Sequence, residues 1–557
     1  MKKLPLVLLV AVELLLLNSS VYSQIPTWLW AKGETGSESV NSVAVDTSGN
    51  FFVAGSFSGE SVTFGSITLT NSHDLDSDLF LAKYDSNGTV QWAISAGDNY
   101  TDEATSVAVD AAGNVYLTGY WYGDTIIFGS FSLHNTYHGN ADIFLVKFDP
   151  DGNVIWAKSA GGSSSDQAKA VAVDASGNVF ITGWFQWAIK FGTITLQNAD
   201  HTGYGSPDIF LAKYDSDGNF QWANSVQGML SDEAKSIAVD NAGNSYVTGY
   251  FASRTITFDN IILANSDSDT TIKWPNNDIF VAKYNADGKA IWAKSAGGSF
   301  HDDGKSVAVD SGSNVYLSGY FASNSIVFER ISLINSSIGT KDTDLFVAKY
   351  DENGNILWAK NAADTNPDIA NSITLDGAGN IYQTGYFSGQ SITFGTITRM
   401  NTSYESAFIT KYDPNGEAIW VINSQGKGWP KAQSIAVSNG NIYIVGNYMA
   451  LPVFGSDTLT ANVGMFIAKC GLTDPTGVKE MDNSSCFTVY PNPVTSEIFI
   501  RTQNGAAVAI FNIHGILLSK FISNNKSDFD ISSFPKGVYI IKVTSKDNCA
   551  IRKLVKE

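Results

Sequence analysis

The sequence is poor in cysteine, in charge and in long apolar segments. Only Cys470, Cys486 and Cys549 occur among 557 residues, so most of the chain folds without disulfides, and spacing does not select a pair. Charged residues make up 16%, the formal net charge is −19, and no basic cluster is present. Nucleic acid is therefore an unsuitable partner, because phosphate backbones are bound by clustered lysine and arginine. The apolar run from Leu4 to Leu17 is shorter than the roughly 20 residues that a membrane-spanning helix needs, so we expect no transmembrane segment.

The first residues have the three parts of an export signal. Lys2 and Lys3 precede the apolar run, and a small-residue site, Val21-Tyr22-Ser23, follows it. We predict that residues 1–23 are a signal peptide that is removed during export through the periplasm.

A unit of 62 to 70 residues recurs along most of the chain. Apolar residues make up 44% and glycine occurs 50 times, which is enough for a large core and many turns. Each unit also contains a Val-Ala-Val-Asp type segment and an Asp-Ile-Phe-Leu-Ala-Lys-Tyr type segment. The seven tryptophans that mark the units are Trp30, Trp92, Trp156, Trp222, Trp292, Trp358 and Trp420.

Within one unit, apolar and polar residues alternate with a period of two. The fourth unit shows this at residues 236–240, 245–250, 278–284 and 290–294, and Gly-Asn or Asp-Gly turns separate the segments. Four short antiparallel strands repeated in this way are typical of a β-propeller. We therefore predict an all-β fold with a seven-bladed β-propeller over residues 24–471.

The order of the segments predicts how the ring closes. The mature chain opens with a lone fourth-type strand, Trp28 to Lys32, whereas the last unit has no fourth strand of its own. We predict that Trp28 to Lys32 pairs beside Gly464 to Lys469. Trp30 would then fill the same slot between blades as the other six tryptophans.

These units resemble a known family. Val171 to Gly183, together with Asp208 to Asp215, is similar to the bacterial SBBP β-propeller repeat, and the resemblance covers roughly residues 24–471. The resemblance implies a propeller fold and export, and it does not imply a reaction.

After Gly471 the repeat ends. Residues 472–486 are rich in polar and turn residues and are predicted to be a linker. Residues 487–557 contain Tyr490-Pro491-Asn492-Pro493, Gly537-Val538-Tyr539 and a basic C-terminus. This segment resembles the type A C-terminal sorting domain of the type IX secretion system. The resemblance implies a small β-sandwich, a partner in the type IX secretion machinery, and a product that is secreted or attached to the cell surface.

Strand alternation places the loops of variable length on one face of the propeller, where we expect any binding site. An acidic residue recurs there eight positions before the Asp that ends the Val-Ala-Val-Asp segment. If these side chains converge at the channel mouth, they would suit calcium, which prefers oxygen ligands; no other cofactor is expected. The alternative, which we favour, is that each carboxylate caps its own loop by accepting backbone N–H bonds. The six residues are Glu38, Asp102, Asp166, Asp232, Asp302 and Asp368, and Pro430 takes the position in the seventh unit.

Four aromatic residues that depart from the repeat are candidate ligand contacts, because aromatic side chains are common at sugar-binding and peptide-binding surfaces. For Trp184, near the end of a strand, we predict core packing. His134 and His138 are interpreted as solvated loop residues, and no catalytic motif stands out from the repeats. The four candidate contacts are Trp121, Trp187, Tyr204 and Trp274.

The sequence thus predicts an exported propeller that binds a glycan or a protein without catalysing a reaction. The first alternative is a secreted carbohydrate-active enzyme with acidic residues at the channel mouth. The second is a structural component of the cell surface.

Overall fold

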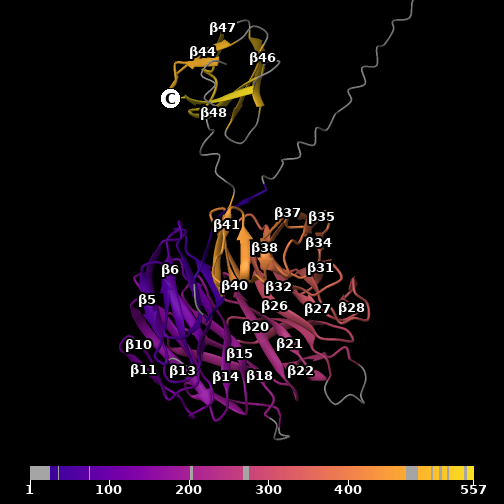
Figure 1. The fold of residues 1–557 in the computed structure, drawn as a ribbon. Coiled ribbons are helices and arrows are strands. Elements are labelled where there is room, and N and C mark those ends of the chain that lie inside the picture. Colours follow the sequence, from indigo (N-terminus) through magenta and orange to yellow (C-terminus); the bar gives the residue numbers. More distant parts are fainter. Residues whose placement is uncertain are drawn as a thin grey trace, which may run out of the picture. The chain divides into compact units, whose positions relative to one another are not determined.

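The computed structural model describes residues 25–34, 37–73, 76–200, 205–267, 275–471, 487–502, 506–512, 517–523, 526–544 and 549–556. Every secondary-structure element in these ranges is a β-strand, and the strands run from β1 to β49 (Figure 1). Internal contacts divide the chain into two units, with the boundary after Leu472. The predicted signal peptide and linker lie outside the described residues. Within the ranges given, no helix is long and apolar enough to cross a membrane.

The first unit consists of antiparallel sheets that share one strand order, first to fourth. The first strands are β2 (Ser37–Val45), β8 (Asp102–Val109), β14 (Asp166–Val173), β20 (Asp232–Val239), β26 (Asp302–Val309), β32 (Asp368–Leu375) and β39 (Lys431–Ser438). The second strands are β3 (Phe51–Ser58), β9 (Val115–Trp121), β15 (Val179–Phe185), β21 (Ser245–Phe251), β27 (Val315–Phe321), β33 (Ile381–Phe387) and β40 (Asn441–Phe454). The third strands are β6 (Ser77–Tyr84), β12 (Asp142–Phe148), β18 (Asp208–Tyr214), β24 (Asp278–Tyr284), β30 (Asp344–Tyr350), β36 (Ser406–Tyr412) and β42 (Val463–Gly471). The fourth strands are β7 (Val90–Ala96), β13 (Val154–Gly162), β19 (Phe220–Val226), β25 (Ala290–Ala296), β31 (Ile356–Ala363), β37 (Ala418–Asn423) and β1 (Thr27–Gly33).

A short hairpin lies between the second and third strands of most sheets, and the sequence analysis did not predict it. Its strands have only four residues each, too few for the alternation to be distinguished from a loop. Its turn takes a left-handed residue, Gly65 (φ 57°) in the first hairpin and Glu329 (φ 51°) in the fifth. The hairpins are β4 (Ser61–Phe64) with β5 (Ile67–Thr70), β10 (Thr125–Phe128) with β11 (Phe131–His134), β16 (Ala188–Phe191) with β17 (Ile194–Gln197), β22 (Thr255–Phe258) with β23 (Ile261–Ala264), β28 (Ser325–Phe328) with β29 (Ile331–Ile334), and β34 (Ser391–Phe394) with β35 (Ile397–Met400). Two further short strands, β38 (Gln425–Gly428) and β41 (Asp457–Thr458), pair with β40.

The N-terminal strand completes the last sheet. β1 pairs antiparallel with β42, with Trp28 opposite Cys470 and Lys32 opposite Ile467. The Ala31 backbone N–H also donates to the Asp457 carboxylate at 2.8 Å. Cys470 is a buried free thiol at this junction. The predicted pairing of the N-terminal strand is confirmed.

The first strands neighbour one another in turn, from β2 to β8 and onward to β39, and β39 lies against β2. A serine hydroxyl on one first strand accepts a hydrogen bond from a backbone N–H of a neighbouring first strand. Ser42 accepts from Val107 at 3.1 Å, and Ser434 accepts from Val43, also at 3.1 Å. The contact between β39 and β2 therefore has the same chemistry as a contact between sheets that are consecutive in the chain.

The recurring tryptophans join each fourth strand to the sheet that follows. Trp222 Nε1 donates to the Ala286 carbonyl at 3.1 Å, and a Cβ added at Gly288 would lie 2.8 Å from the indole ring. The turn must therefore have glycine where it meets the indole ring. Trp30 occupies the equivalent position, since a Cβ at Gly88 would lie 2.9 Å from its ring. The predicted slot for Trp30 is confirmed.

The second unit has two antiparallel sheets, ordered β43-β44-β47 and β46-β45-β48-β49. Buried side chains of both sheets, such as Ile500 and Ile541, form one hydrophobic cluster. The strands are β43 (Phe487–Tyr490), β44 (Glu497–Thr502), β45 (Ala506–Asn512), β46 (Leu517–Ser523), β47 (Lys526–Asp530), β48 (Gly537–Thr544) and β49 (Cys549–Lys556).

Candidate functional site

The recurring acidic residues are buried loop caps. The side chain of Glu38 lies outside the described residues, and the other five residues are 0% exposed. Asp302 accepts hydrogen bonds from the backbone N–H groups of Ala322 and Ser323, both at 3.1 Å, and from the Ser323 hydroxyl at 2.7 Å. Backbone N–H groups also donate to Asp102, Asp166, Asp232 and Asp368. This arrangement is the capping alternative, and these carboxylates do not line an accessible surface.

Each of these five residues has a second buried aspartate near it, at the start of the third strand of the preceding sheet. Burial, and then the charge of Asp142, raises the pKa of Asp166 to about 9, and burial raises the pKa of Asp142 to about 6. One carboxyl oxygen of each lacks a hydrogen-bond partner. We infer that such a pair holds a proton at neutral pH. The pairs are Asp78 with Asp102, Asp142 with Asp166, Asp208 with Asp232, Asp278 with Asp302, and Asp344 with Asp368.

The pairing of buried aspartates explains why the acidic residues recur. It also argues against calcium binding at these positions. Across the described residues, no three His, Cys, Asp or Glu side chains are grouped so as to hold a metal ion. We predict that a metal chelator such as EDTA leaves the thermal unfolding midpoint unchanged, because protonated carboxyl pairs do not attract a hard cation. Differential scanning calorimetry with and without EDTA checks this. A midpoint that falls with EDTA and recovers with added calcium would contradict it.

The four predicted aromatic contacts have different placements. Trp121 is fully buried in a hydrophobic cluster, because it takes the position at the end of the second strand where Phe185 stands in the next sheet. It is therefore a core residue and not a ligand contact. Trp187 is 42% exposed and has a left-handed backbone, with φ 61°. Tyr204 and Trp274 lie outside the described residues.

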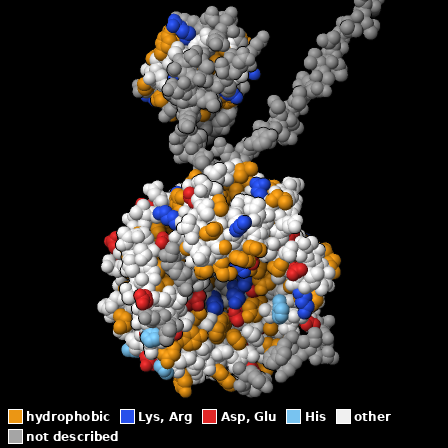
Figure 2. Space-filling view, viewed as in Figure 1, with side chains coloured by type: hydrophobic (Ala, Val, Ile, Leu, Met, Phe, Trp, Pro, Cys, Tyr) orange, Lys and Arg blue, Asp and Glu red, His pale blue; other side chains and the backbone are white. Residues whose placement is uncertain are grey.

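The structure brings together another set of side chains, where the first strands meet. Figure 2 shows a hollow in which basic and acidic side chains gather, over the region of β20, β26 and β32 in Figure 1. We call this the axial hollow. We assign to it charged and polar residues that stand one or three positions after the buried aspartates, together with Lys431, which follows Pro430. Aromatic residues of the second strands that pair with these first strands complete the set, and ion pairs, ring contacts and electrostatic coupling link its members. They are Glu103, Tyr120, Gln167, Lys169, Trp184, Glu233, Lys235, Tyr250, Asp303, Lys305, Tyr320, Tyr386 and Lys431.

Most charges in the axial hollow are paired. Lys235 forms an ion pair with Glu233, and Lys305 forms one with Asp303 at 2.9 Å. Each of these lysine ammonium groups also lies over a tyrosine ring, 5.2 Å from Tyr250 for Lys235 and 5.3 Å from Tyr320 for Lys305. The same strands therefore supply cations, acids and flat apolar rings side by side. Groups of this kind orient a ligand by hydrogen bonds while rings stack against it.

Lys169 differs from its neighbours because it forms no ion pair with any residue that the structure describes. Its ammonium donates to the Gln167 side-chain oxygen at 2.6 Å and lies 5.5 Å from the centre of the Tyr120 ring. Burial lowers the pKa of Lys169, and the nearby Lys235 lowers it further. An anion that binds beside the ammonium would offset both effects and favour its charged form.

Sequence reasoning missed this set because it concentrated on acidic residues that recur in almost every unit, whereas the charged residues of the axial hollow differ from sheet to sheet. It also did not consider the aromatic residues that recur on the second strands. Trp184 was predicted to pack in the core, yet it is only partly buried. The available signal was charge at alternate positions of a strand, as in Glu233 and Lys235, on either side of the buried Ala234. Such alternation predicts a strand with one face toward solvent.

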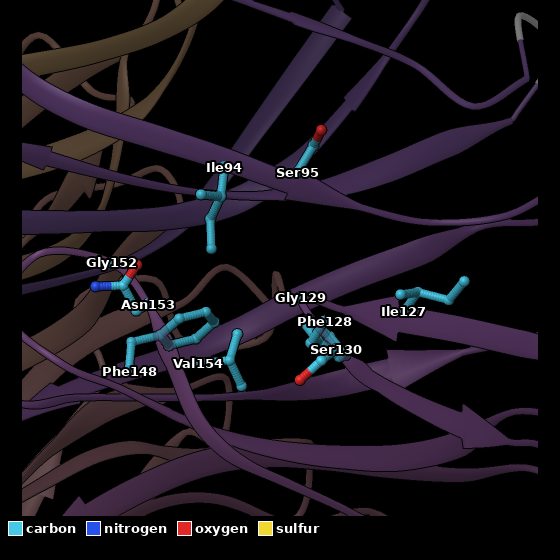
Figure 3. Close-up of a pocket in the computed structure, with 10 residues that line it drawn as sticks. All are labelled: Ile94, Ser95, Ile127, Phe128, Gly129, Ser130, Phe148, Gly152, Asn153 and Val154. Carbon is cyan, nitrogen blue, oxygen red and sulfur yellow. The ribbon is translucent and has the colours of Figure 1, made fainter.

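A groove of about 370 Å³ lies at the outer edge of the first and second sheets (Figure 3). Ile94 of β7, Phe128 of the β10–β11 hairpin and Val154 of β13 line it. An equivalent groove between β1 and the first sheet is lined by Gly65, Gly88 and Val90. Because the groove recurs with the repeat, we assign it to the architecture and not to a specific site.

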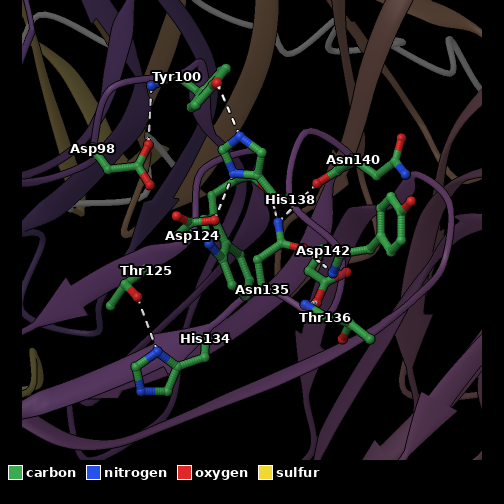
Figure 4. A network of polar contacts seen from close by, with 12 residues as sticks. Asp98, Tyr100, Asp124, Thr125, His134, Asn135, Thr136, His138, Asn140 and Asp142 are labelled. Atoms are coloured by element: carbon green, nitrogen blue, oxygen red, sulfur yellow. Dashed lines mark hydrogen bonds and ion pairs between the residues drawn. The ribbon is translucent and has the colours of Figure 1, made fainter.

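The loop histidines belong to a surface network (Figure 4). His138 Nδ1 lies 2.6 Å from Asp124, and its Nε2 lies 3.3 Å from the Tyr100 hydroxyl. The side chains of His138 and Asp124 are 58% and 76% exposed. Catalytic dyads depend on a desolvated carboxylate that fixes the imidazole, so this exposed pair is a poor catalyst.

Two families match parts of the chain. A secretion system C-terminal sorting domain matches residues 488–557. The SBBP beta-propeller repeat matches residues 231–250, which include β20 and most of β21. The C-terminal match covers almost all of the segment that the sequence analysis assigned to sorting.

Several known proteins are similar to this chain. An uncharacterized WD repeat-containing protein of Acanthamoeba polyphaga mimivirus is 26% identical over 469 residues, which cover 71% of this chain and 33% of that protein. The regulatory protein FlaEY of Caulobacter vibrioides is 24% identical over 335 residues, which cover 55% of this chain and 33% of that protein. The chain thus spans a third of the length of these relatives.

Among solved structures, Sqt1 of Chaetomium thermophilum is 9% identical with a TM-score of 0.36, and the match covers 79% of this chain and 99% of Sqt1. PorZ, a surface component of the type-IX secretion system of Porphyromonas gingivalis, is 10% identical with a TM-score of 0.16, and the match covers 95% of this chain and 100% of PorZ.

From the two family matches, the chain carries an SBBP beta-propeller repeat and, at residues 488–557, a type IX secretion system sorting domain, which directs it to the cell surface or out of the cell.

Proposed function

We propose that this protein is a non-enzymatic binding protein, secreted or displayed at the cell surface, that holds a glycan in its axial hollow. Its first unit is a seven-bladed β-propeller closed by the N-terminal strand, and its second is a β-sandwich that engages the type IX secretion machinery. The pairing of β1 with β42 and the contact of β39 with β2 support the closed ring. The two families matched support the export route.

The arrangement of acids favours binding over glycoside hydrolysis. Hydrolysis needs an accessible carboxylic acid with a raised pKa. In this chain the carboxyls of Asp102 and Asp166 have raised pKa values, but they are fully buried. Glu233, which borders the axial hollow, has a lowered pKa, although burial opposes this, because Lys235 stabilises its charged form. Glu233 is therefore unsuited to donate a proton.

The observation that carries the proposal is the row of aromatic side chains on consecutive second strands. Trp184, Tyr250, Tyr320 and Tyr386 are partly exposed, and each follows a glycine at the same position of its strand. Flat rings held on a rigid sheet pack against sugar faces at little cost in conformational entropy. Trp187 lies three residues beyond Trp184, and we propose that it extends the binding surface.

We predict that the full chain binds oligosaccharides on a glycan array and that Trp184→Ala weakens binding about tenfold. The ring supplies stacking energy of roughly 1.4 kcal/mol, which corresponds to that factor. Isothermal titration calorimetry with the best array ligand measures it. Tyr137→Ala is the matched control, because Tyr137 is 59% exposed and lies outside the axial hollow. Equal loss in both variants would contradict the assignment of the site.

A turnover assay separates binding from catalysis. The same ligand is incubated with the full chain, and products are followed by chromatography over time. We expect no product. Product that accumulates in proportion to protein concentration would overturn the non-enzymatic proposal in favour of a carbohydrate-active enzyme.

A further inference from the structure

We propose that the axial hollow selects acidic saccharides and that Lys169 receives their carboxylate. This inference rests on the proposed glycan-binding function and adds the chemical class of the ligand. It is drawn from a difference between otherwise equivalent sheets.

Three consecutive first strands place a lysine at the same position, and two of the three also supply its counter-ion. Glu233 stands two residues before Lys235, and Asp303 stands two residues before Lys305. In the remaining strand, Gln167 stands where the other two have an acid. Its amide oxygen accepts a hydrogen bond from the Lys169 ammonium at 2.6 Å. An amide orients the ammonium without neutralising it, so this site keeps a positive charge that the other two have cancelled.

No other acid in the described part of the axial hollow takes the missing role. Glu103 lies on the neighbouring first strand, β8. That strand has no lysine at the position that Lys169 takes in β14, so Glu103 is the acid to consider as a partner for Lys169. Its carboxylate accepts the Asn41 side-chain amide at 2.8 Å and the Tyr120 hydroxyl. It forms no ion pair with Lys169 among the described residues. Lys235 and Lys305 add positive potential at Lys169, and the carboxylates of Glu233 and Glu103 oppose it.

The surroundings of Lys169 favour a sugar acid over a peptide carboxylate. Trp184 is the cross-strand partner of Gln167, and the Tyr120 ring lies below the Lys169 ammonium. The cation thus lies over one aromatic ring, and a second ring is the cross-strand neighbour of the glutamine that orients it. A uronic acid residue presents a carboxylate on a ring whose face can stack, and it matches both features at once. Figure 2 shows that basic side chains in this hollow are open to solvent.

The test uses the full chain, with hexagalacturonate as the acidic probe and maltohexaose as the neutral one. Gln167→Glu supplies the counter-ion that the next two sheets already have, so the repeat itself shows that the fold accepts it. We expect this variant to bind hexagalacturonate at least tenfold more weakly and maltohexaose as the wild type does. Lys169→Gln should have the same effect, and Lys190→Gln, which changes an exposed lysine on β16, should have none.

The outcomes separate the two proposals. Wild-type binding of hexagalacturonate that survives Gln167→Glu would overturn the role of Lys169. Equal affinity of the wild type for both probes would overturn the selectivity while leaving glycan binding in place. A protein that binds neither probe, nor any saccharide on the array, would overturn the proposed function itself. Binding of a peptide with a free C-terminal carboxylate in preference to hexagalacturonate would assign the site to protein ligands and overturn the saccharide class.

Discussion

Asp166→Asn is expected to raise the unfolding midpoint of this protein at about pH 8, although the substitution removes a fully buried and hydrogen-bonded carboxyl group. Asp166 and Asp142 form one of the buried pairs, and each has an oxygen without a partner. An asparagine amide fits the same space, carries no charge and can donate to Asp142. The gain in unfolding free energy should exceed about 1 kcal/mol, because a tenfold change in a protonation equilibrium corresponds to roughly 1.4 kcal/mol.

The sign follows from proton linkage. The pKa of Asp166 is about 9 in the folded protein, against 3.8 for the free side chain, because burial and the charge of Asp142 disfavour the ionised form. Between these two values the folded state binds more protons than the unfolded state, so stability falls as the pH rises. The pair lowers the free energy of unfolding little below about pH 4 and most near pH 9. The stability gained by Asp166→Asn should therefore grow over the same pH interval.

Calorimetry of both proteins from acidic to alkaline pH measures this. The control is Asp151→Asn, which changes an exposed turn carboxylate and should change the unfolding midpoint little. A variant that is less stable than wild type at alkaline pH would show that the pair is ionised and stabilised in some other way.

Trp30→Ala is expected to destabilise the first unit by about 2 to 4 kcal/mol, as removal of a large aromatic side chain from a packed site does. The ring of Trp30 lies against Gly88 of the first sheet and 6.0 Å from the ring of Phe51. The substitution therefore weakens the contact between the last sheet, which contains β1, and the first. Chemical denaturation followed by tryptophan fluorescence and circular dichroism gives the change in unfolding free energy.

Leu29→Ala is the matched control on the same strand, because Leu29 is 38% exposed and should cost well under 1 kcal/mol. If Trp30→Ala costs no more than Leu29→Ala, the side chain of Trp30 does not stabilise the contact between the last sheet and the first. If both variants lose cooperativity, so that the unit unfolds in two steps, the last sheet separates from the first before the remaining sheets unfold.

The strand pattern could be predicted because the repeat imposes the same physical requirement many times. The alternation in Asp278 to Tyr284 indicates a strand, and the surplus strand at Trp28 has one vacant place to fill. These features depend on local sequence and on simple counting, so no three-dimensional information was needed.

The axial hollow and the carboxyl pairs could not be predicted in this way. Asp142 and Asp166 belong to different sheets, and only the packing of sheets brings them together. Where the first strand of the last sheet is preceded by Pro430 instead of an acid, the third strand before it begins with Ser406 instead of Asp. In this case the two positions change together. The sequence contains this relation, but its meaning is clear only once the contact between the sheets is known. Trp184 was assigned to the core because strand alternation does not tell which sheet face meets solvent.

The pairing of Thr27 with Gly471 places the start and the end of the first unit side by side. A short peptide could join them, and new termini could then be opened in the turn after any fourth strand. Such a circularly permuted protein would keep every contact between sheets, because the contacts depend on which sheets are neighbours and not on which is made first. We therefore expect gene rearrangements that shift the starting point by whole repeats to leave the fold of this unit unchanged.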